Sequence, residues 1–220
     1  MKAALIGTGK TGSKVQEALA LEQNALFNTS RPPTVDALRA YDVVFVFVPG
    51  DAFLEMIPTL LSAQIAVVSG ATGATIPDSV KTQILQGSRP WLIAQNFSPA
   101  MQMIQQALKW IGDHPDWLAE SEFSLHEIHH QQKKDAPSGT AKLWVEWLAS
   151  RDVSVTSHRE GDVLGDHELR IGTPLERITL RHEALDRSLF AQGAIQAAHW
   201  ILRPERAPGL YSMKDVFESE

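Results

Sequence analysis

Residues 3–12 read AALIGTGKTG, and this stretch decides the fold class. Residues 3–6 form an apolar run typical of a buried strand, and residues with helical apolar spacing follow the glycines. In such a strand–turn–helix setting, the spacing G-x-G-x-x-G allows a tight turn and lets a pyrophosphate approach the start of the helix. A purely structural turn is the alternative. We predict cofactor contacts from Gly7, Thr8, Gly9, Lys10, Thr11 and Gly12.

Three further apolar runs, residues 43–48, 65–68 and 91–94, are typical of parallel strands covered on both faces. Helical patterns at residues 51–61 and 78–85 separate them, and Pro58 is expected to bend or break the first helix. This alternation predicts an α/β fold with a doubly wound, Rossmann-type parallel sheet. Ligands bind such sheets at the carboxyl ends of the strands. The polar tails there are turns or further cofactor contacts, namely Gly70, Ala71, Thr72, Ala94, Gln95, Asn96 and Phe97.

The strand expected at residues 25–27 should end in an acid that binds the adenine ribose. Asn28, Ser30 and Arg31 follow instead, and no carboxylate stands there. Small polar side chains and an arginine suit a 2′-phosphate better than a ribose diol. We therefore predict that NADPH is bound at least as well as NADH, with a surface turn as the alternative.

A second informative stretch, residues 127–140, reads EIHHQQKKDAPSGT. It lies between an alternating strand at residues 123–128 and a helical pattern at residues 143–148, so it is predicted to be a loop. Pro137 disfavours helix at the residue before it, and Ser138 is a good N-cap. Gly139 and Thr140 then offer free N–H groups, which bind anions such as carboxylates.

Charged and titratable side chains surround this predicted helix start. Lys133 or Lys134 could add a positive charge, and His129 and His130 could exchange protons near neutral pH. The loop therefore predicts a pocket for a carboxylate substrate with a proton donor beside it. The plainer alternatives are surface or hydrogen-bonded histidines, a solvated charge run and a simple helix cap.

Zinc is a third interpretation of the same stretch, through His126, His129 and His130. We expect no metal, because adjacent strand residues point to opposite faces and the chain has no cysteine.

The loop resembles the signature of the dihydrodipicolinate reductase family, E-x-H-H-x-x-K-x-D-A-P-S-G-T-A. The chain matches it at Glu127, His129, His130, Lys133, Asp135, Ala136, Pro137, Ser138, Gly139, Thr140 and Ala141. The family pattern R-x-G-x-x-x-G-x-H-E is matched by Arg159, Gly161, Gly165, His167 and Glu168. Residues 70–73 and 94–97 resemble the G-T-T-G and A-x-N-F segments that lie along the nicotinamide half of the cofactor. Lys10, Thr11 and Ala71 depart from the usual family residues.

The resemblance implies reduction of 4-hydroxy-tetrahydrodipicolinate, a small dicarboxylate, with NADPH or NADH in lysine and diaminopimelate biosynthesis. It implies His129 as general acid or base and Lys133 as the second catalytic group. It further implies substrate binding by His130, Ser138, Gly139 and Thr140, and structural roles for His167 and His182. Family members form tetramers through the second domain, so a homotetramer is expected.

Period-two patterns after residue 148 predict a mixed or antiparallel sheet in a separate α+β unit. We expect a dinucleotide-binding domain at residues 1–98, completed by 204–220. The expected substrate-binding and oligomerisation domain is residues 99–203.

Composition narrows the class of protein further. The 220 residues are 44% hydrophobic and contain no cysteine, so a core is feasible and disulfides are excluded. The net charge of −6 argues against nucleic acid as a partner. Neither a membrane-spanning stretch nor a signal peptide is recognisable, and we expect a cytoplasmic protein.

Two rival functions remain open at this point. Another two-domain NAD(P)-dependent reductase would share the glycine loop, but it has no reason to combine paired histidines with the Ser-Gly-Thr turn. A non-catalytic nucleotide-binding sensor would be expected to lose His129 or Lys133, and both are present.

Overall fold

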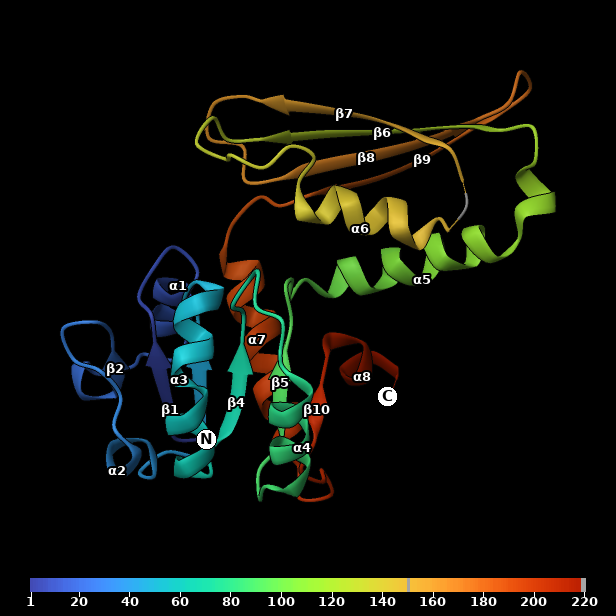
Figure 1. Cartoon of the computed structure of the whole chain (residues 1–220). Coiled ribbons are helices and arrows are strands. Elements are labelled where there is room, and N and C mark those ends of the chain that lie inside the picture. The colour runs from blue at the N-terminus through green and yellow to red at the C-terminus, as the bar shows by residue number, and fades with distance from the viewer. Residues whose placement is uncertain (150, 219–220) are drawn as a thin grey trace. The chain divides into compact units, whose positions relative to one another are not determined.

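The computed structural model describes residues 1–149 and 151–218. The chain divides into two compact units, the first formed by Met1–Ser98 with Arg187–Glu220 and the second by Pro99–Asp186. Figure 1 shows the helices and strands of each unit. The predicted division placed residues 187–203 in the second unit. They are grouped with the first because their helix packs on the first unit's sheet.

The first unit is built on a six-stranded sheet in the order β10-β5-β4-β3-β1-β2, in which all neighbours are parallel. Its strands are β1 (Ala3–Ile6), β2 (Leu26–Phe27), β3 (Val43–Val46), β4 (Ala66–Ser69), β5 (Trp91–Ile93) and β10 (Leu210–Tyr211). Strands β1, β3 and β4 are buried along their whole length, because helices cover both faces of the sheet. The predicted Rossmann-type fold class is therefore confirmed.

Two hydrophobic clusters lie on opposite faces of this sheet. One joins Leu5, Phe45 and Val68 to residues of α1 (Gly12–Ala18), α7 (Ser188–Ile201) and α8 (Met213–Glu218). The other joins Ala4, Val44 and Val46 to residues of α2 (Val35–Leu38), α3 (Gly50–Ala63) and α4 (Asp78–Gln86). A short 3-10 helix, η1 (Gln23–Ala25), precedes β2.

Helix α3 corrects one expectation from the sequence. It continues through Pro58, so the proline does not break the helix, which was one of the two effects that the sequence predicted. Pro58 lies on the exposed side, whereas Phe53, Ile57 and Leu60 are buried against the sheet. The packing of that buried face holds the helix together despite the backbone hydrogen bond that proline cannot make.

The second unit contains a four-stranded sheet in the order β7-β6-β8-β9. Strand β6 (Glu122–His129) is parallel to β7 (Val153–Arg159) and antiparallel to β8 (Asp166–Gly172), which is antiparallel to β9 (Arg177–Glu183). Helices α5 (Pro99–Asp113) and α6 (Gly139–Trp147) lie along one face of this sheet, as Figure 1 shows. The short 3-10 helix η2 (Pro115–Leu118) follows α5. The predicted mixed α+β unit is therefore confirmed.

None of the described helices combines the length and apolarity that crossing a bilayer requires.

Candidate active site

The three glycines of the loop between β1 and α1 have different surroundings and therefore different roles. Gly7 has a φ of +92°, and a Cβ there would lie 2.3 Å from the carbonyl oxygen of Phe47. A Cβ on Gly12 would lie 2.0 Å from the carbonyl oxygen of Gly7, whereas one on Gly9 would have no atom within 4 Å. Gly7 therefore makes the turn, Gly12 lets helix and strand approach, and Gly9 leaves open space for a ligand.

A hollow of about 430 Å³ adjoins this loop within the first unit. It brings the glycine loop together with Gly70 and Thr72 from the tail of β4, two of the predicted cofactor contacts. Phe47, Val48 and Pro49, which the sequence did not single out, line it as well. A Cβ on Gly70 would lie 2.4 Å from the ring of Phe47, so glycine lets the β4 tail pass close to that ring. The glycine loop and the β4 tail thus border one hollow at the carboxyl ends of the strands, where such sheets bind ligands.

Other predicted cofactor residues shape the walls of the first unit. Ala71 is buried, and its N–H donates to the hydroxyl of Ser69. Phe97 is buried and packs on Phe47, with ring centroids 5.8 Å apart. The Asn96 side-chain oxygen accepts from the Ser98 N–H, Ala94 is half-buried and Gln95 is exposed. These residues, like Thr8, do not line the hollow itself.

The turn after β2 is held by its own polar groups. The side-chain oxygen of Asn28 accepts from the N–H groups of Ser30 and Arg31 at 2.9 and 3.0 Å. The guanidinium of Arg31 donates to the carbonyl of Gln23 at 2.7 Å and lies 5.1 Å from the centre of the Phe27 ring. The arginine is therefore fixed beside the strand end, with its positive charge at the edge of the sheet.

In the second unit, strand register places several polar side chains in adjacent rows on the inner face. Glu127 on β6 stands opposite His167 on β8, which stands opposite His182 on β9. His129, two positions along β6, stands opposite Arg159 on β7. Because residues two apart share a face, these groups point to the same side as α6 and its hydrophobic core.

Glu127 is a fully buried carboxylate at the centre of these rows. Its Oε1 accepts from the Ser138 N–H at 2.9 Å and lies 3.4 Å from a guanidinium nitrogen of Arg159. Its Oε2 lies 3.5 Å from His129 Nδ1 and 3.6 Å from His167 Nε2. Burial by itself raises the pKa of Glu127, but the polar contacts with His167 and Ser138 outweigh it and hold the pKa well below its usual range. Glu127 is therefore ionised at neutral pH.

His129 is 6% exposed, and its ring meets that of His167 edge to face. A Cβ on Gly165 would lie 3.2 Å from His129 Nε2, so the missing side chain makes room for the imidazole. Burial, and then the charge that His167 can carry, lower the pKa of His129 to about 4, although Glu127 opposes the shift. His129 is therefore neutral at neutral pH in the ligand-free protein.

Lys133 lies in the loop after β6, a quarter exposed, and pairs with Asp135 at 2.9 Å. This contact is the main reason that the pKa of Asp135 lies below its usual range. Arg159 anchors the loop, since its guanidinium donates to the backbone carbonyls of Lys133 and Asp135. The same guanidinium reaches Glu127, so the loop and the buried carboxylate share one anchor.

The start of α6 is partly occupied by internal contacts. The Ser138 hydroxyl caps the helix by accepting from the Ala141 N–H and lies 3.2 Å from His167 Nε2. Its N–H already donates to Glu127, and the residue is 1% exposed. Gly139, in contrast, is exposed, with no atom within 4 Å of where a Cβ would be. The exposed part of this helix start is therefore Gly139 and the half-buried Thr140, and a backbone hydrogen bond from Gly139 to the Asp135 carboxylate helps to lower the pKa of Asp135. His130, just beyond β6, is also half-buried.

Two sets of side chains could be metal ligands: the predicted His126, His129 and His130, and the group of Glu127, His129 and His167. His126 points to the other face of β6, where its Nδ1 lies 2.8 Å from the Thr156 hydroxyl. Among the described residues, Glu127, His129 and His167 form a group whose ligand atoms lie within 4.8 Å of one another. The guanidinium of Arg159 beside this carboxylate opposes a second cation, so we interpret the group as a hydrogen-bonding cluster.

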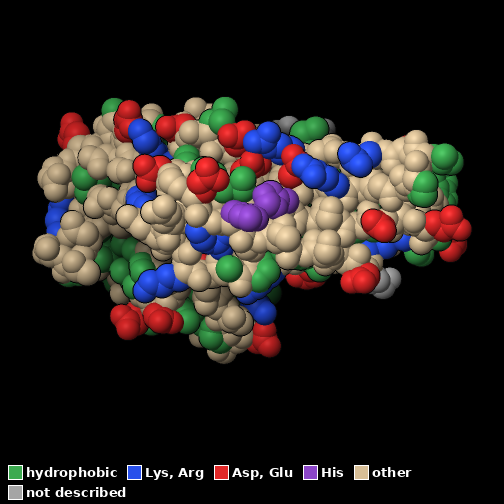
Figure 2. All heavy atoms as spheres, turned by 90° about the horizontal axis from the view of Figure 1, so that it is seen from above, with side chains coloured by type: hydrophobic (Ala, Val, Ile, Leu, Met, Phe, Trp, Pro, Cys, Tyr) green, Lys and Arg blue, Asp and Glu red, His purple; other side chains and the backbone are tan. Residues whose placement is uncertain are grey.

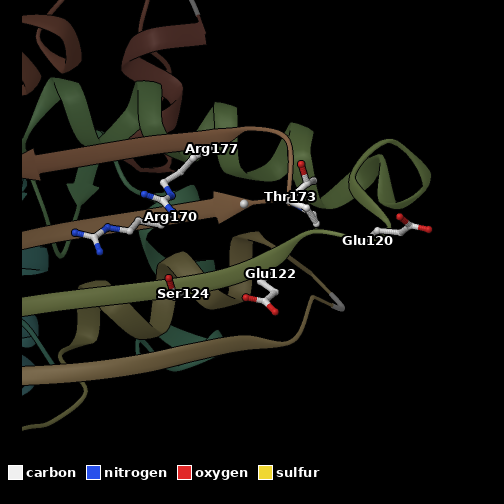
Figure 3. A pocket seen from close by; sticks show the side chains of 8 residues that line it. Glu120, Glu122, Ser124, Arg170, Thr173 and Arg177 are labelled. Atoms are coloured by element: carbon white, nitrogen blue, oxygen red, sulfur yellow. The ribbon is translucent and has the colours of Figure 1, made fainter.

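The outer face of the same sheet is polar. The rings of His126 and His158 contact each other in a tilted arrangement, with centroids 4.7 Å apart. On the face of the molecule in Figure 2, histidine side chains lie together among Lys, Arg, Asp and Glu side chains. A hollow of about 570 Å³ lies at one end of the sheet. Figure 3 shows side chains that line it, among them Glu122 and Ser124 on β6 and Arg170 and Arg177 on the neighbouring strands. None of the predicted site residues lines it.

Sequence reasoning gave no catalytic role to Glu127, Arg159 or His167, although all three match family patterns. His167 was interpreted as structural. The available signal was the alternation in β6, which puts an acid at 127 and an imidazole at 129 on one face. The contributions of β7 and β8 become visible only with the strand register.

Comparisons with known proteins agree on one family. The family model described as "Dihydrodipicolinate reductase, C-terminus" matches residues 100–217. A 4-hydroxy-tetrahydrodipicolinate reductase of Methanospirillum hungatei is 33% identical over 195 residues, which cover 80% of this chain and 75% of that protein. One from Methanoculleus marisnigri is 32% identical over 225 residues, covering 89% and 85%.

Solved structures show the same fold. A dipicolinate-bound dihydrodipicolinate reductase from Paenisporosarcina sp. TG-14 aligns over 99% of this chain and 100% of that one, with a TM-score of 0.75 and 17% identity. An aspartate dehydrogenase from Thermotoga maritima aligns over 93% and 97%, with a TM-score of 0.52 and 11% identity.

Proposed function

The chain belongs to the dihydrodipicolinate reductase family, and on that premise we propose that it reduces 4-hydroxy-2,3,4,5-tetrahydrodipicolinate to tetrahydrodipicolinate. The reaction consumes NAD(P)H and a proton, and the 4-hydroxyl group leaves as water. This reaction belongs to lysine and diaminopimelate biosynthesis. The observation that carries the proposal is the grouping, within one unit, of a buried imidazole, an ammonium group and an exposed helix start whose Gly139 backbone already binds a carboxylate, that of Asp135.

In the second unit, some residues bind the dicarboxylate substrate and another transfers a proton. The N–H groups of Gly139 and Thr140 bind a substrate carboxylate, aided by the start of α6. Lys133 exchanges Asp135 for the negative charge of the substrate, and His130 is a further substrate contact. His129 supplies or holds the proton that the reduced ring needs. Because His129 is neutral in the ligand-free protein, the arrival of two carboxylates favours its protonated form.

The first unit binds the cofactor at the glycine loop and the tails of β4 and β5. NAD(P)H, when bound, supplies the hydride. Gly9 leaves space for a pyrophosphate, while Lys10 adds positive charge beside it. Arg31, with Asn28 and Ser30, favours NADPH at least as much as NADH, because an arginine and small polar groups suit a 2′-phosphate.

Three expectations from the sequence extend this proposal. The substrate is a small dicarboxylate, the enzyme acts in the cytoplasm, and it assembles as a homotetramer through the second unit. Gel filtration with light scattering tests the last of these, and a monomer at micromolar concentration would contradict it.

The decisive experiment is an NADPH-oxidation assay with freshly generated product of dihydrodipicolinate synthase. We expect oxidation that depends on both enzyme and substrate. Aspartate and diaminopimelate with NADP+ serve as controls for the rival amino-acid dehydrogenase function, which the fold alone would permit. Tight NADPH binding without turnover would favour a sensor instead.

A further inference from the structure

We propose that Glu127 is a positioning residue for His129, fixing which nitrogen of the imidazole holds the proton and tying that imidazole to the loop of Lys133. The inference rests on the proposed function in taking His129 as the acid–base group. It assigns a role to a buried acid that neither the motif nor the comparisons explain.

Strand β6 fixes the positions of Glu127 and His129 relative to each other. Glu127 and His129 are two apart on β6, so their side chains leave the same face. Their strand is central, between β7 and β8, and its backbone is held by hydrogen bonds on both sides. A side chain on such a strand is placed more precisely than one on a loop. The carboxylate is therefore a fixed reference point for the imidazole beside it.

The two carboxylate oxygens of Glu127 have different neighbours. Oε1 is taken by the Ser138 N–H at 2.9 Å and by Arg159 at 3.4 Å. Oε2 is turned toward His129 Nδ1 at 3.5 Å and His167 Nε2 at 3.6 Å. Neither Oε2 nor His129 Nδ1 has a hydrogen-bond partner within normal distance, and both are buried. An unpaired buried acceptor facing an unpaired buried nitrogen is costly unless a proton lies between them.

The Glu127 carboxylate favours one of the two neutral tautomers of His129. A proton on Nδ1 satisfies Oε2 and leaves Nε2 as the nitrogen that exchanges a proton with the substrate. Nε2 lies over Gly165, where the absence of a side chain leaves room. A carboxylate bonded to one imidazole nitrogen sets the role of the other, and contacts that are long without substrate tighten when it binds. Lys133 and Arg159 are charged groups near this imidazole, and His167 is a titratable one.

Arg159 connects the surroundings of the two predicted catalytic groups, His129 and Lys133. Arg159 contacts Glu127 and also donates to the backbone carbonyl of Lys133 at 3.1 Å. Removing the carboxylate charge frees this guanidinium from its buried partner. The imidazole and the ammonium-bearing loop would then lose their common anchor, so Glu127 acts on both groups without touching the substrate.

The test combines nuclear magnetic resonance with kinetics. In protein carrying 15N-labelled histidine, the His129 signals, assigned by their loss in His129→Gln, are expected to report the Nδ1–H tautomer at pH 7. The tautomer is read from the wild-type chain without substrate, so the result stands even if Glu127→Gln fails to fold or the proposed function is wrong. A wild-type His129 with its proton on Nε2 overturns the inference.

The kinetic arm compares Glu127→Gln with Glu122→Gln, the same substitution on the same strand but on the exposed outer face. We expect Glu127→Gln to lower kcat at least about tenfold, with a smaller change in KM, and to shift the pH profile of kcat. Glu127→Asp, which keeps the charge, should recover part of kcat, and Glu122→Gln should match wild type. A kcat for Glu127→Gln within twofold of wild type overturns the inference.

Two outcomes distinguish the positioning role of Glu127 from the proposed function and from a metal site. A wild-type enzyme that shows the expected tautomer but no turnover leaves the positioning intact and refutes the proposed function. Purified enzyme with stoichiometric zinc that is lost in Glu127→Gln would overturn the positioning role in favour of a metal site at Glu127, His129 and His167.

Discussion

At the scale of single residues, the buried imidazole and the loop lysine are the groups on which turnover depends. His129→Gln and Lys133→Ala are each expected to lower kcat by at least about a hundredfold, the usual scale for losing an acid–base group. Steady-state NADPH oxidation measures this effect. Lys134→Ala, which removes an exposed neighbouring charge, is the matched control and should stay near wild type. Near-normal turnover of either site variant would contradict the assignment.

Acid should destabilise the fold through the same cluster. The pKa of His129 is about 4 in the folded chain against an ordinary value of 6.5, so the unfolded chain takes up the proton first as pH falls. Its contribution to the free energy of unfolding is therefore present above pH 6.5 and lost between 6.5 and about 4, up to about 3 kcal/mol. Glu127, whose pKa is depressed, adds a further loss below its ordinary value of 4.5.

Urea denaturation between pH 7 and pH 4 checks this linkage. Wild type should lose stability steadily over that range, and His129→Gln should lose less of it between pH 6.5 and 4 because the titrating group is gone. Identical slopes for the two proteins would contradict a depressed His129 pKa.

The motif was sufficient to predict His129, Lys133 and the exposed helix start, because they follow one another in the chain. It could not reveal the roles of Glu127, Arg159 and His167. Those depend on three strands meeting in one register, and a carboxylate in sequence gives no sign that it will be fully buried.

At the scale of elements, the turn between β1 and α1 distinguishes packing from binding. Gly12→Ala would place a methyl group 2.0 Å from the Gly7 carbonyl oxygen and should lower stability by about 1–3 kcal/mol. Gly9→Ala meets no protein atom, so it should fold normally but weaken NADPH binding about tenfold or more. Thermal unfolding and fluorescence titration measure the two effects. Unchanged NADPH affinity in Gly9→Ala would exclude a pyrophosphate at this glycine.

Buried strands were the elements best predicted from sequence, because apolar runs such as residues 43–46 leave little choice of environment. Helix α7 shows the limit of that reasoning. Its small buried residues, among them Ala191, Ala194 and Ala197, indicate a close-packed helix but not its partner. The partner is the first sheet, where a Cβ on Gly193 would lie 1.8 Å from the Phe97 carbonyl oxygen.

At the scale of the whole molecule, a cofactor that binds only the folded chain should stabilise it. At a concentration 100 times its dissociation constant, NADPH should add about 2.7 kcal/mol to the free energy of unfolding. Arg31→Ala should reduce this gain for NADPH more than for NADH, because a charge-assisted contact to the 2′-phosphate is lost. Thermal shift assays with both nucleotides measure the difference. Equal losses for the two would mean that Arg31 does not contact the 2′-phosphate.

The two-unit organisation was predicted because helix-alternating strands give way to period-two patterns along the chain. The point at which the chain returns to the first unit was less predictable. Residues 187–203 follow the second sheet directly, and nothing in their local pattern says which sheet they cover. That information lies in the complementary surface, which is distant in sequence.

Strand β6 turns Glu127 and His129 inward while Glu122 and Ser124 face outward. Alternate positions of one segment are thus exposed to different constraints, solvent on one side and a packed polar cluster on the other. An engineer could recode the outward positions, for example to attach a label, and leave the inward ones untouched.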